Sequence, residues 1–227
     1  MTKNKNLLGC SGKKRSGKNT IATIINKLTK KDNYYTNLGV NPPDDFNDNL
    51  YEEKSFAYLV KKFASELTGI PMKGWETEED KAKFLGPEWD YIDETTGLKM
   101  KMTRRVMLKK LGSDACNQNL HRNTWINGLF QNYKGVRDFN NYREYSEFGS
   151  KWLITDVRFP QEVEAIKNRD GIVIRVIRPG KQDGDTHISE TALDDYKDFD
   201  FVIINDGNLE ELEEKVKNIL IKIGLII

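Results

Sequence analysis

A glycine-containing segment near the N-terminus has the residue types and spacing to bind phosphate. Within residues 12–20, Gly12, Gly17 and Lys18 fit the pattern G-x-x-x-x-G-K of the phosphate-binding loop. Glycine lets the backbone curl until successive N–H groups approach phosphate oxygens, and a lysine here can reach the β- and γ-phosphates of a nucleotide. A helix that begins at the loop adds positive potential. The segment therefore predicts a nucleotide phosphate site.

The same loop departs from the usual pattern at one position. Asn19 stands where a serine or threonine usually ligates Mg²⁺, and Thr20 follows one residue later. We expect Arg15 to contact phosphate because it lies inside the loop, and the hydroxyl of Thr20 can still face the nucleotide. For Lys13 and Lys14, a solvated basic turn is as good an interpretation as phosphate contact.

A second group of candidate residues follows the apolar run 152–155. Asp156 is placed to hold Mg²⁺ through water or to bind a substrate hydroxyl, although it would also suit the cap of the helix that Pro160 opens. Arg158 is placed to stabilise a phosphate in transfer, or to form a surface ion pair. The metal ligand stays unassigned, with Thr20 and Asp156 as candidates, directly or through water.

The middle of the chain supplies further cations and an aromatic ring. Arg104 and Arg105 follow Thr103 at a predicted helix start, where guanidinium groups suit bidentate contact with a monophosphate, or simply form an exposed turn. Lys61 lies on an amphipathic helix and either binds substrate or faces solvent. Trp125 either stacks on a base or fills a helical core.

Neither histidine supports a different chemistry. His187 is close to Ser189 and Glu190, but the sequence shows no nucleophile elbow or third orienting partner for a catalytic triad. His121 has no metal-ligating partner at a useful spacing.

Alternating apolar runs and amphipathic segments must position these residues. We expect a largely parallel sheet covered by helices on both faces, with ligands beyond the carboxyl ends of the strands. The predicted strands are 4–11, 152–156, 172–177 and 201–204, and the predicted helices are 17–31, 58–68, 77–84, 103–118, 124–133, 160–166, 189–194 and 209–223. Residues 32–54 and 134–150 are interpreted as loops, residues 72–102 as mostly irregular, and residues 178–188 as a lid.

Length and composition place limits on the function. The chain has 227 residues, which fits a single α/β domain whose core spans about 1–40 and 151–227, with a helical insertion at about 55–150. The net charge of +1 gives no general attraction to a nucleic acid polymer or a membrane. Two cysteines, Cys10 and Cys116, form no disulfide framework and suit a reducing cytoplasm. No signal peptide is evident.

The order of these motifs resembles the bacteriophage-type deoxynucleoside monophosphate kinases of the P-loop kinase superfamily. The loop is similar to that family's Arg-Ser-Gly-Lys-Asp-Thr, with Asn19 in place of the aspartate. The other similar segments, in chain order, are Ser55-Phe56-Ala57 with Lys61, Thr103-Arg104-Arg105 followed by Leu111-Gly112-Ser113-Asp114, Trp125, Thr155-Asp156-Val157-Arg158-Phe159-Pro160, His187-Ile188-Ser189-Glu190 and Asn205-Asp206-Gly207.

This resemblance implies transfer of the ATP γ-phosphate to a deoxynucleoside 5′-monophosphate with Mg²⁺. It implies ATP contacts for Arg15, Gly17, Asn19 and Thr20, and monophosphate contacts for Arg105, Gly112, Trp125 and Asp156, with Lys61 as a weaker candidate. It also suggests a homodimer, and the host cytoplasm if the protein is phage-encoded. Two alternatives remain open from the residues: a P-loop kinase of another phosphorylated small molecule, such as phosphomevalonate, and a non-catalytic ATP-binding module.

Overall fold

The computed structural model describes residues 3–30, 50–134, 150–180 and 188–227. The chain divides into two compact units. Unit 1 comprises Met1–Ser55 and Tyr133–Ile227, and unit 2 comprises Phe56–Asn132. Each unit has its own core and is described separately below.

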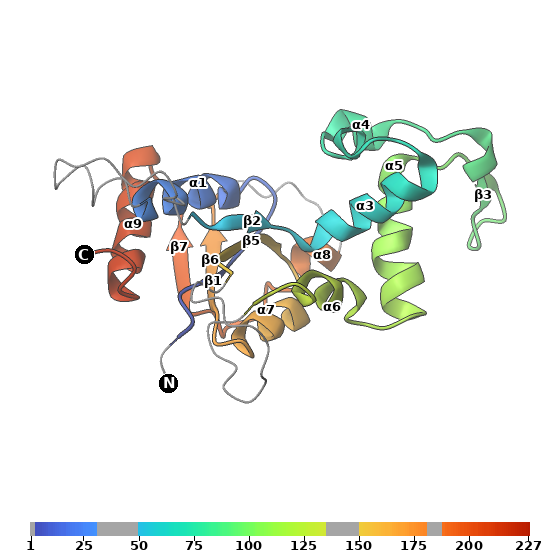
Figure 1. The fold of residues 1–227 in the computed structure, drawn as a ribbon. Coiled ribbons are helices and arrows are strands. Elements are labelled where there is room, and N and C mark those ends of the chain that lie inside the picture. The colour runs from blue at the N-terminus through green and yellow to red at the C-terminus, as the bar shows by residue number, and fades with distance from the viewer. Residues whose placement is uncertain (1–2, 31–49, 135–149, 181–187) are drawn as a thin grey trace, which may run out of the picture. The chain divides into compact units, whose positions relative to one another are not determined.

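Unit 1 is built on a five-stranded sheet in the order β2-β5-β1-β6-β7 (Figure 1). Its strands are β1 (Leu7–Gly12), β2 (Glu52–Lys54), β5 (Trp152–Val157), β6 (Ile172–Ile177) and β7 (Phe201–Ile204). Each neighbouring pair of strands is parallel. The carboxyl ends of β1 and β5 therefore lie at the same edge of the sheet, which is where ligands bind in open parallel sheets.

Helices cover both faces of this sheet. The helices of unit 1 are α1 (Lys18–Thr29), α7 (Pro160–Lys167), α8 (Ile188–Thr191) and α9 (Leu209–Lys222). Ile21 and Ile25 of α1 and Leu220 of α9 are fully buried in one cluster with Leu8 and Ile174 of the sheet. Val163 and Ile166 of α7 are also fully buried, and Ile166 packs closely against Gly9 of β1. Burial on both faces explains why β1 is apolar along its length rather than alternating.

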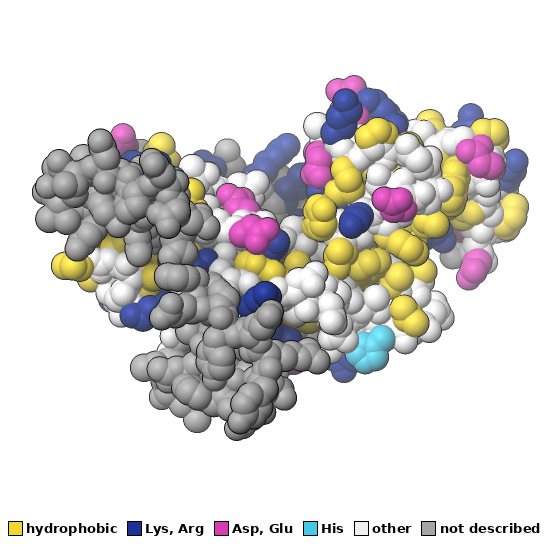
Figure 2. All heavy atoms as spheres, in the orientation of Figure 1, with side chains coloured by type: hydrophobic (Ala, Val, Ile, Leu, Met, Phe, Trp, Pro, Cys, Tyr) yellow, Lys and Arg dark blue, Asp and Glu magenta, His cyan; other side chains and the backbone are white. Residues whose placement is uncertain are grey.

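Unit 2 is largely helical. Its elements are α3 (Phe56–Thr68), 3₁₀ turns at Met72–Trp75 and Pro87–Trp89, α4 (Glu78–Ala82), β3 (Tyr91–Ile92), β4 (Lys99–Met100), α5 (Arg104–Lys109), a π-helix (Lys110–Gln118) and α6 (Thr124–Phe130). Ala64, Trp75, Met102 and Met107 form a buried cluster in this unit. Figure 2 shows apolar side chains among charged ones on the surface of unit 2. Phe63 and Leu67 of α3 are among the exposed apolar residues of this unit.

The structure confirms the expected α/β class and parallel sheet, and it corrects several details. Residues 52–54, interpreted as part of a loop, form β2, which pairs with β5. The irregular stretch 72–102 contains the antiparallel pair β3–β4. The helix expected at 103–118 changes from α-helix to π-helix after Lys109. Within unit 1, the ring of Tyr133 packs against that of Trp152.

None of the described helices has the length and apolar character needed to cross a bilayer. Both cysteines are free, and Cys10 is fully buried in β1, as the sequence predicted.

Candidate functional site

The backbone between β1 and α1 has the curled form that the glycine spacing predicts. Gly12 has a φ of 156° and Gly17 a φ of 109°. A Cβ on Gly12 would lie 2.6 Å from the carbonyl oxygen of Val176, and one on Gly17 would lie 2.6 Å from Asn205 Nδ2. Arg15 adopts φ 61°, a left-handed conformation that costs a non-glycine residue about 1–2 kcal/mol. Close packing therefore requires both glycines, and the surrounding loop holds Arg15 in a strained conformation.

Lys18 lies across the loop at the start of α1. Its Nζ donates to the carbonyl oxygens of Gly12 (2.7 Å) and Lys13 (2.8 Å). An ammonium group has three donors, so these two bonds orient the group and leave one donor for a ligand. Burial, with the nearby charge of Arg158, lowers the pKa of Lys18 to about 8, and the carboxylates of Glu190 and Asp156 oppose this shift. A phosphate anion would stabilise the charged amine further.

Asn205, which directly follows β7, supports the loop through a hydrogen bond. Asn205 is buried, and its Nδ2 donates to the carbonyl oxygen of Ser16 at 2.8 Å. The sequence indicated only a turn at Asn205-Asp206-Gly207, with no sign of this contact. The hydroxyl of Ser16 is buried and has no hydrogen-bond partner among the described residues. The loop therefore contains a buried polar atom that a bound phosphate oxygen could satisfy.

Asp156 lies near the carboxyl end of β5, and its Oδ2 accepts a hydrogen bond from Ser55 Oγ at 2.7 Å. The N-cap of α7 is Phe159, so the alternative that Asp156 caps this helix is wrong. The negative charge of Asp156 acts on Lys18 and on Glu162. Asp156 therefore lies close enough to the loop for its charge to act on Lys18.

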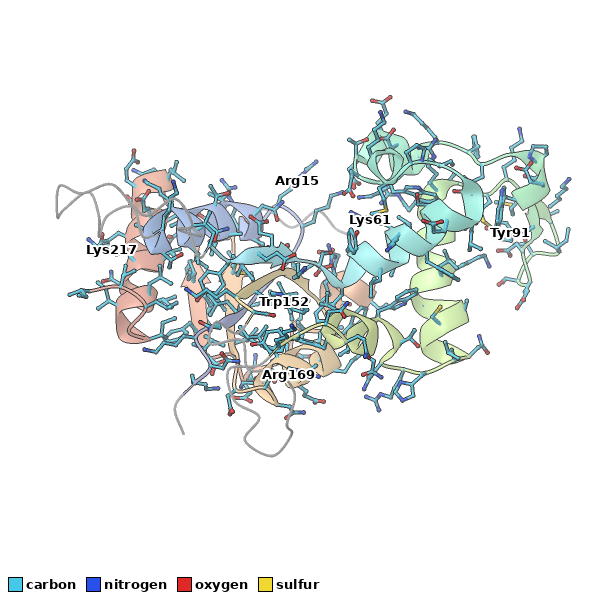
Figure 3. The ribbon with its side chains drawn as sticks, in the orientation of Figure 1. Arg15, Lys61, Tyr91, Trp152, Arg169 and Lys217 are labelled. Atoms are coloured by element: carbon cyan, nitrogen blue, oxygen red, sulfur yellow. The ribbon has the colours of Figure 1, made fainter. Side chains whose placement is uncertain are left out.

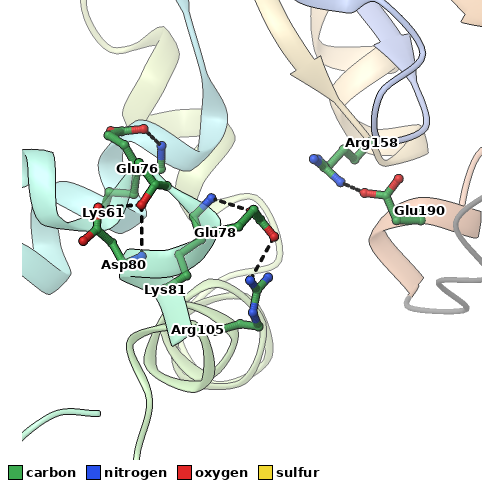
Figure 4. Close-up of polar contacts among 9 residues, drawn as sticks. Lys61, Glu76, Glu78, Asp80, Lys81, Arg105, Arg158 and Glu190 are labelled. Atoms are coloured by element: carbon green, nitrogen blue, oxygen red, sulfur yellow. Dashed lines mark hydrogen bonds and ion pairs between the residues drawn. The ribbon is translucent and has the colours of Figure 1, made fainter. Parts of the chain in front are cut away.

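Arg158 is held by two glutamates. Its guanidinium forms an ion pair with Glu190 of α8 (Figure 4), and its backbone N–H donates to Glu162 of α7 at 2.6 Å. The ion pair is partly buried, since the side chains are 32% and 8% exposed. The sequence offered a surface ion pair as the alternative role of Arg158. The pair exists, but it lies against the phosphate loop, because Glu190 also accepts from the backbone N–H of Lys14.

A buried arginine in β6 escaped the sequence analysis. Arg175 donates to Ser11 Oγ at 2.9 Å, lies 5.5 Å from the ring centroid of Phe199, and pairs with Asp194. Asp194 also binds Lys13 of the loop. A cavity of about 430 Å³ is lined by these charged residues and by Ser16. The available signal was a single arginine within the apolar run 172–177.

The remaining loop residues lie at the surface of unit 1. Arg15, Asn19 and Thr20 are all exposed, and the Arg15 side chain extends from the loop (Figure 3). Among the described residues, no group of three His, Cys, Asp or Glu side chains could enclose a metal ion. In phosphate sites Mg²⁺ is commonly held by one or two carboxylates, substrate phosphates and water. The carboxylate of Asp156 and the hydroxyl of Thr20 have suitable donor chemistry for that arrangement.

In unit 2 the two neighbouring arginines have different surroundings. Arg105 is 44% exposed and binds Glu78 of α4 at 2.9 Å (Figure 4). Arg104 is 15% exposed. Its Nη1 donates to the carbonyl oxygen of Gly74 at 2.6 Å, and its guanidinium lies 6.0 Å from the ring centroid of Trp75. Arg104 therefore supports the core of unit 2, whereas Arg105 presents its charge at the surface.

Three other predicted substrate residues also lie in unit 2. Trp125 Nε1 donates to the carbonyl oxygen of Gly112 at 3.0 Å, so the structure joins these two residues directly. The centroid of the Trp125 ring lies 6.5 Å from that of Phe63. Because Trp125 is half-buried, its side chain packs within unit 2 and also keeps part of its surface exposed. Lys61 of α3 is paired with Glu76 and is mostly buried (Figure 4). His187 and most of the predicted lid, 178–188, lie outside the described residues.

The family model of deoxynucleotide monophosphate kinases matches residues 47–216. The chain belongs to the deoxynucleotide monophosphate kinase family. The matched range contains Lys61, Arg105, Asp156, Arg158 and Glu190, and it begins after the phosphate loop, whose assignment rests on its own backbone geometry.

Individual members of this family are similar along much of the chain. A deoxynucleotide monophosphate kinase of Enterobacteria phage T4 is 31% identical over 74% of this chain and 64% of its own length. A deoxynucleotide monophosphate kinase of Escherichia phage RB69 is 25% identical over 94% of this chain and 99% of its own length. A putative deoxynucleotide monophosphate kinase of Acanthamoeba polyphaga mimivirus is 26% identical over 92% of this chain and 93% of its own length.

Proposed function

We propose that this protein transfers the γ-phosphate of ATP to a deoxynucleoside 5′-monophosphate, which yields ADP and a deoxynucleoside diphosphate. The observation that carries the proposal is the arrangement of Lys18, which is pinned across a curled glycine loop near Asp156 and Arg158. The named relatives support the choice of acceptor. None of them favours the phosphomevalonate-like kinase or the non-catalytic module.

The donor site is proposed to lie at the loop. Its N–H groups, the Lys18 ammonium and the guanidinium of Arg15 would neutralise the triphosphate, with Asn19 and Thr20 at the first turn of α1. Mg²⁺, when bound, would neutralise charge on the phosphates, and Asp156 and Thr20 would hold it directly or through water. Arg158 would stabilise the charge that develops on the transferred group.

The acceptor is proposed to bind through unit 2, which corresponds to the expected helical insertion. Arg105 would bind the monophosphate, Trp125 would stack on the base beside Gly112, and Lys61 and Arg104 would contribute positive charge. An ionised phosphate oxygen of the acceptor attacks the γ-phosphorus, and the bond from this phosphorus to the bridging oxygen of ADP breaks. Because that oxygen is already ionised, no general base is needed.

The proposal is tested by measuring ADP formation from ATP and Mg²⁺ with each common deoxynucleoside and ribonucleoside monophosphate. We expect rapid turnover with at least one deoxynucleoside monophosphate and little turnover with water alone. The diphosphate product is identified separately by chromatography. Turnover that does not depend on the acceptor, or phosphomevalonate as the best acceptor, would contradict the proposal.

A further inference from the structure

The carboxylate of Glu190 connects two parts of the site that are far apart in the sequence. Its Oε1 pairs with the guanidinium of Arg158, and its Oε2 accepts from the backbone N–H of Lys14 at 2.8 Å. Lys14 belongs to the phosphate loop, while Arg158 follows β5. One side chain from α8 therefore sets the position of a predicted catalytic guanidinium relative to the loop.

The surroundings of Glu190 indicate that this contact is built into the site. The carboxylate is 8% exposed, and burial of a carboxylate is costly unless cations and N–H groups compensate its charge. Here the compensation includes Lys18 and Arg175 as well as Arg158. Burial lowers the pKa of both Lys18 and Arg175, and the charge of Glu190 opposes the shift at each of them. Glu190 thus lies within a group of three cations beside the loop.

A carboxylate in this place does not suit direct contact with a nucleotide, because it would repel the phosphates. It does suit the orientation of an arginine. A guanidinium has five N–H donors in a fixed plane, and a bond to one of them orients the others. Without that bond, the long side chain of Arg158 would sample several rotamers, and only some would direct its donors toward the transferred phosphate.

We propose that Glu190 is a positioning residue for phosphoryl transfer, which aligns the Arg158 guanidinium with the backbone amides of the phosphate loop. The expected effect of Glu190 on the rate of phosphoryl transfer rests on the proposed function. A misplacement of about 1 Å at a reacting centre can cost about a hundredfold in rate. The loss of Glu190 should therefore act on kcat through Arg158 rather than through stability alone.

The test compares wild type with Glu190→Ala, Glu190→Gln, Arg158→Ala and the double variant Arg158→Ala/Glu190→Ala. We expect Glu190→Ala to lower kcat about tenfold to a hundredfold at saturating substrates. Glu190→Gln should retain part of the activity, because the amide keeps the size and one acceptor oxygen. If Glu190 acts through Arg158, the double variant should be no slower than Arg158→Ala, whereas an action through the Lys14 amide or Lys18 alone would slow both backgrounds equally.

The matched control is Glu213→Gln. Glu213 of α9 is also an ion-paired glutamate, because its Oε1 lies 2.8 Å from Lys27 Nζ of α1, and the substitution removes its charge. Its kcat should equal that of wild type. Thermal unfolding of every variant separates loss of fold from loss of alignment, and Glu190→Gln replaces Glu190→Ala if the latter does not fold. A kcat within twofold of wild type for the folded Glu190 variant, or effects that multiply in the double variant, would overturn the inference.

A second measurement distinguishes this inference from the proposed function. Equilibrium binding of ATP with Mg²⁺, without any acceptor, should weaken several-fold in Glu190→Ala and in Arg158→Ala, with no further loss in the double variant. If wild type binds ATP but phosphorylates no deoxynucleoside monophosphate, the proposed function fails while this binding cycle still decides the role of Glu190. Additive or absent effects on binding would then refute the alignment.

Discussion

Glu162 accepts two hydrogen bonds through a single oxygen, from the backbone N–H groups of Arg158 at 2.6 Å and of Phe159 at 3.0 Å. A proton on the Glu162 carboxyl would therefore lie on the other oxygen, Oε1. Burial, with the nearby charge of Asp156, raises the pKa of Glu162 to about 8, although the two N–H bonds favour the ionised form. A buried carboxyl whose pKa lies well above its ordinary value therefore fixes the turn that carries Arg158 out of β5.

This arrangement predicts how stability depends on pH. Since the pKa of Glu162 is higher in the folded protein than its ordinary value of 4.5, folding takes up a proton between these values. The stabilisation from the protonated carboxyl is complete below about pH 4.5 and is lost as the pH rises through about 8, with a slope of at most about 1.4 kcal/mol per pH unit. Glu162→Gln should keep the acceptor oxygen and remove this slope.

Urea unfolding of wild type and Glu162→Gln at several pH values between 5 and 9 measures the difference. Glu162→Ala serves as the comparison, because it leaves two N–H groups without an acceptor and should be about 1–3 kcal/mol less stable than Glu162→Gln at every pH. Equal pH dependence in wild type and Glu162→Gln would show that Glu162 is ionised throughout.

Lys18→Ala should abolish phosphoryl transfer and leave the fold intact. The Lys18 ammonium is held by two carbonyl oxygens of the loop, at the proposed phosphate site, and loss of a preorganised donor typically costs about 10²–10³ in rate. Steady-state ADP formation measures the loss, while circular dichroism checks the fold. Wild-type activity in this variant would remove the loop from the mechanism.

The lowered pKa of Lys18 should limit activity at alkaline pH. The protonated amine is the form that binds phosphate, so its population in the free protein falls as the pH rises through about 8. We expect kcat/KM for ATP to decline above that pH, whereas kcat should decline at higher pH because bound phosphate favours the charged amine. A flat kcat/KM profile up to pH 10 would contradict the assignment.

Arg104 and Arg105 form a matched pair of neighbours in unit 2 with different expected roles. Arg105→Ala should raise the KM of the acceptor about tenfold or more and leave the KM of ATP and the melting temperature unchanged, because Arg105 is exposed and its ion pair with Glu78 lies at the surface. Arg104→Ala should lower the free energy of unfolding by about 1–3 kcal/mol, because Gly74 loses a donor and Trp75 a packed guanidinium.

Steady-state kinetics with each substrate varied in turn, together with urea unfolding, separates the two arginines. A change confined to the KM of ATP in Arg105→Ala would refute its role at the acceptor.

Trp125 should contribute to acceptor binding through its ring. Trp125→Ala is expected to raise the KM of the acceptor strongly, since stacking of a base on an aromatic side chain is worth about 1–3 kcal/mol. Trp125→Phe keeps a ring but loses the hydrogen bond to Gly112, so it should retain most of the affinity. Similar losses in both variants would instead assign Trp125 to the packing of unit 2.

The sequence by itself determined the features that depend on local spacing. Two glycines and a lysine at set intervals dictate the curled loop between β1 and α1, and apolar runs without alternation dictate a buried parallel sheet. Asp156 and Arg158 could be placed near the loop because the carboxyl ends of parallel strands share one edge. The family followed from the order of these short motifs.

Only the tertiary structure decided the hydrogen-bond or ion-pair partner of each polar side chain. The contact of Glu190 with Arg158 and Lys14, the support of Ser16 by Asn205, and the burial of Arg175 all join residues far apart in the chain. The strand at 52–54 likewise exists because β5 offers it a hydrogen-bonding edge. Local spacing carries no information about such pairings, because their energies depend on burial and on neighbours that the folded chain alone brings together.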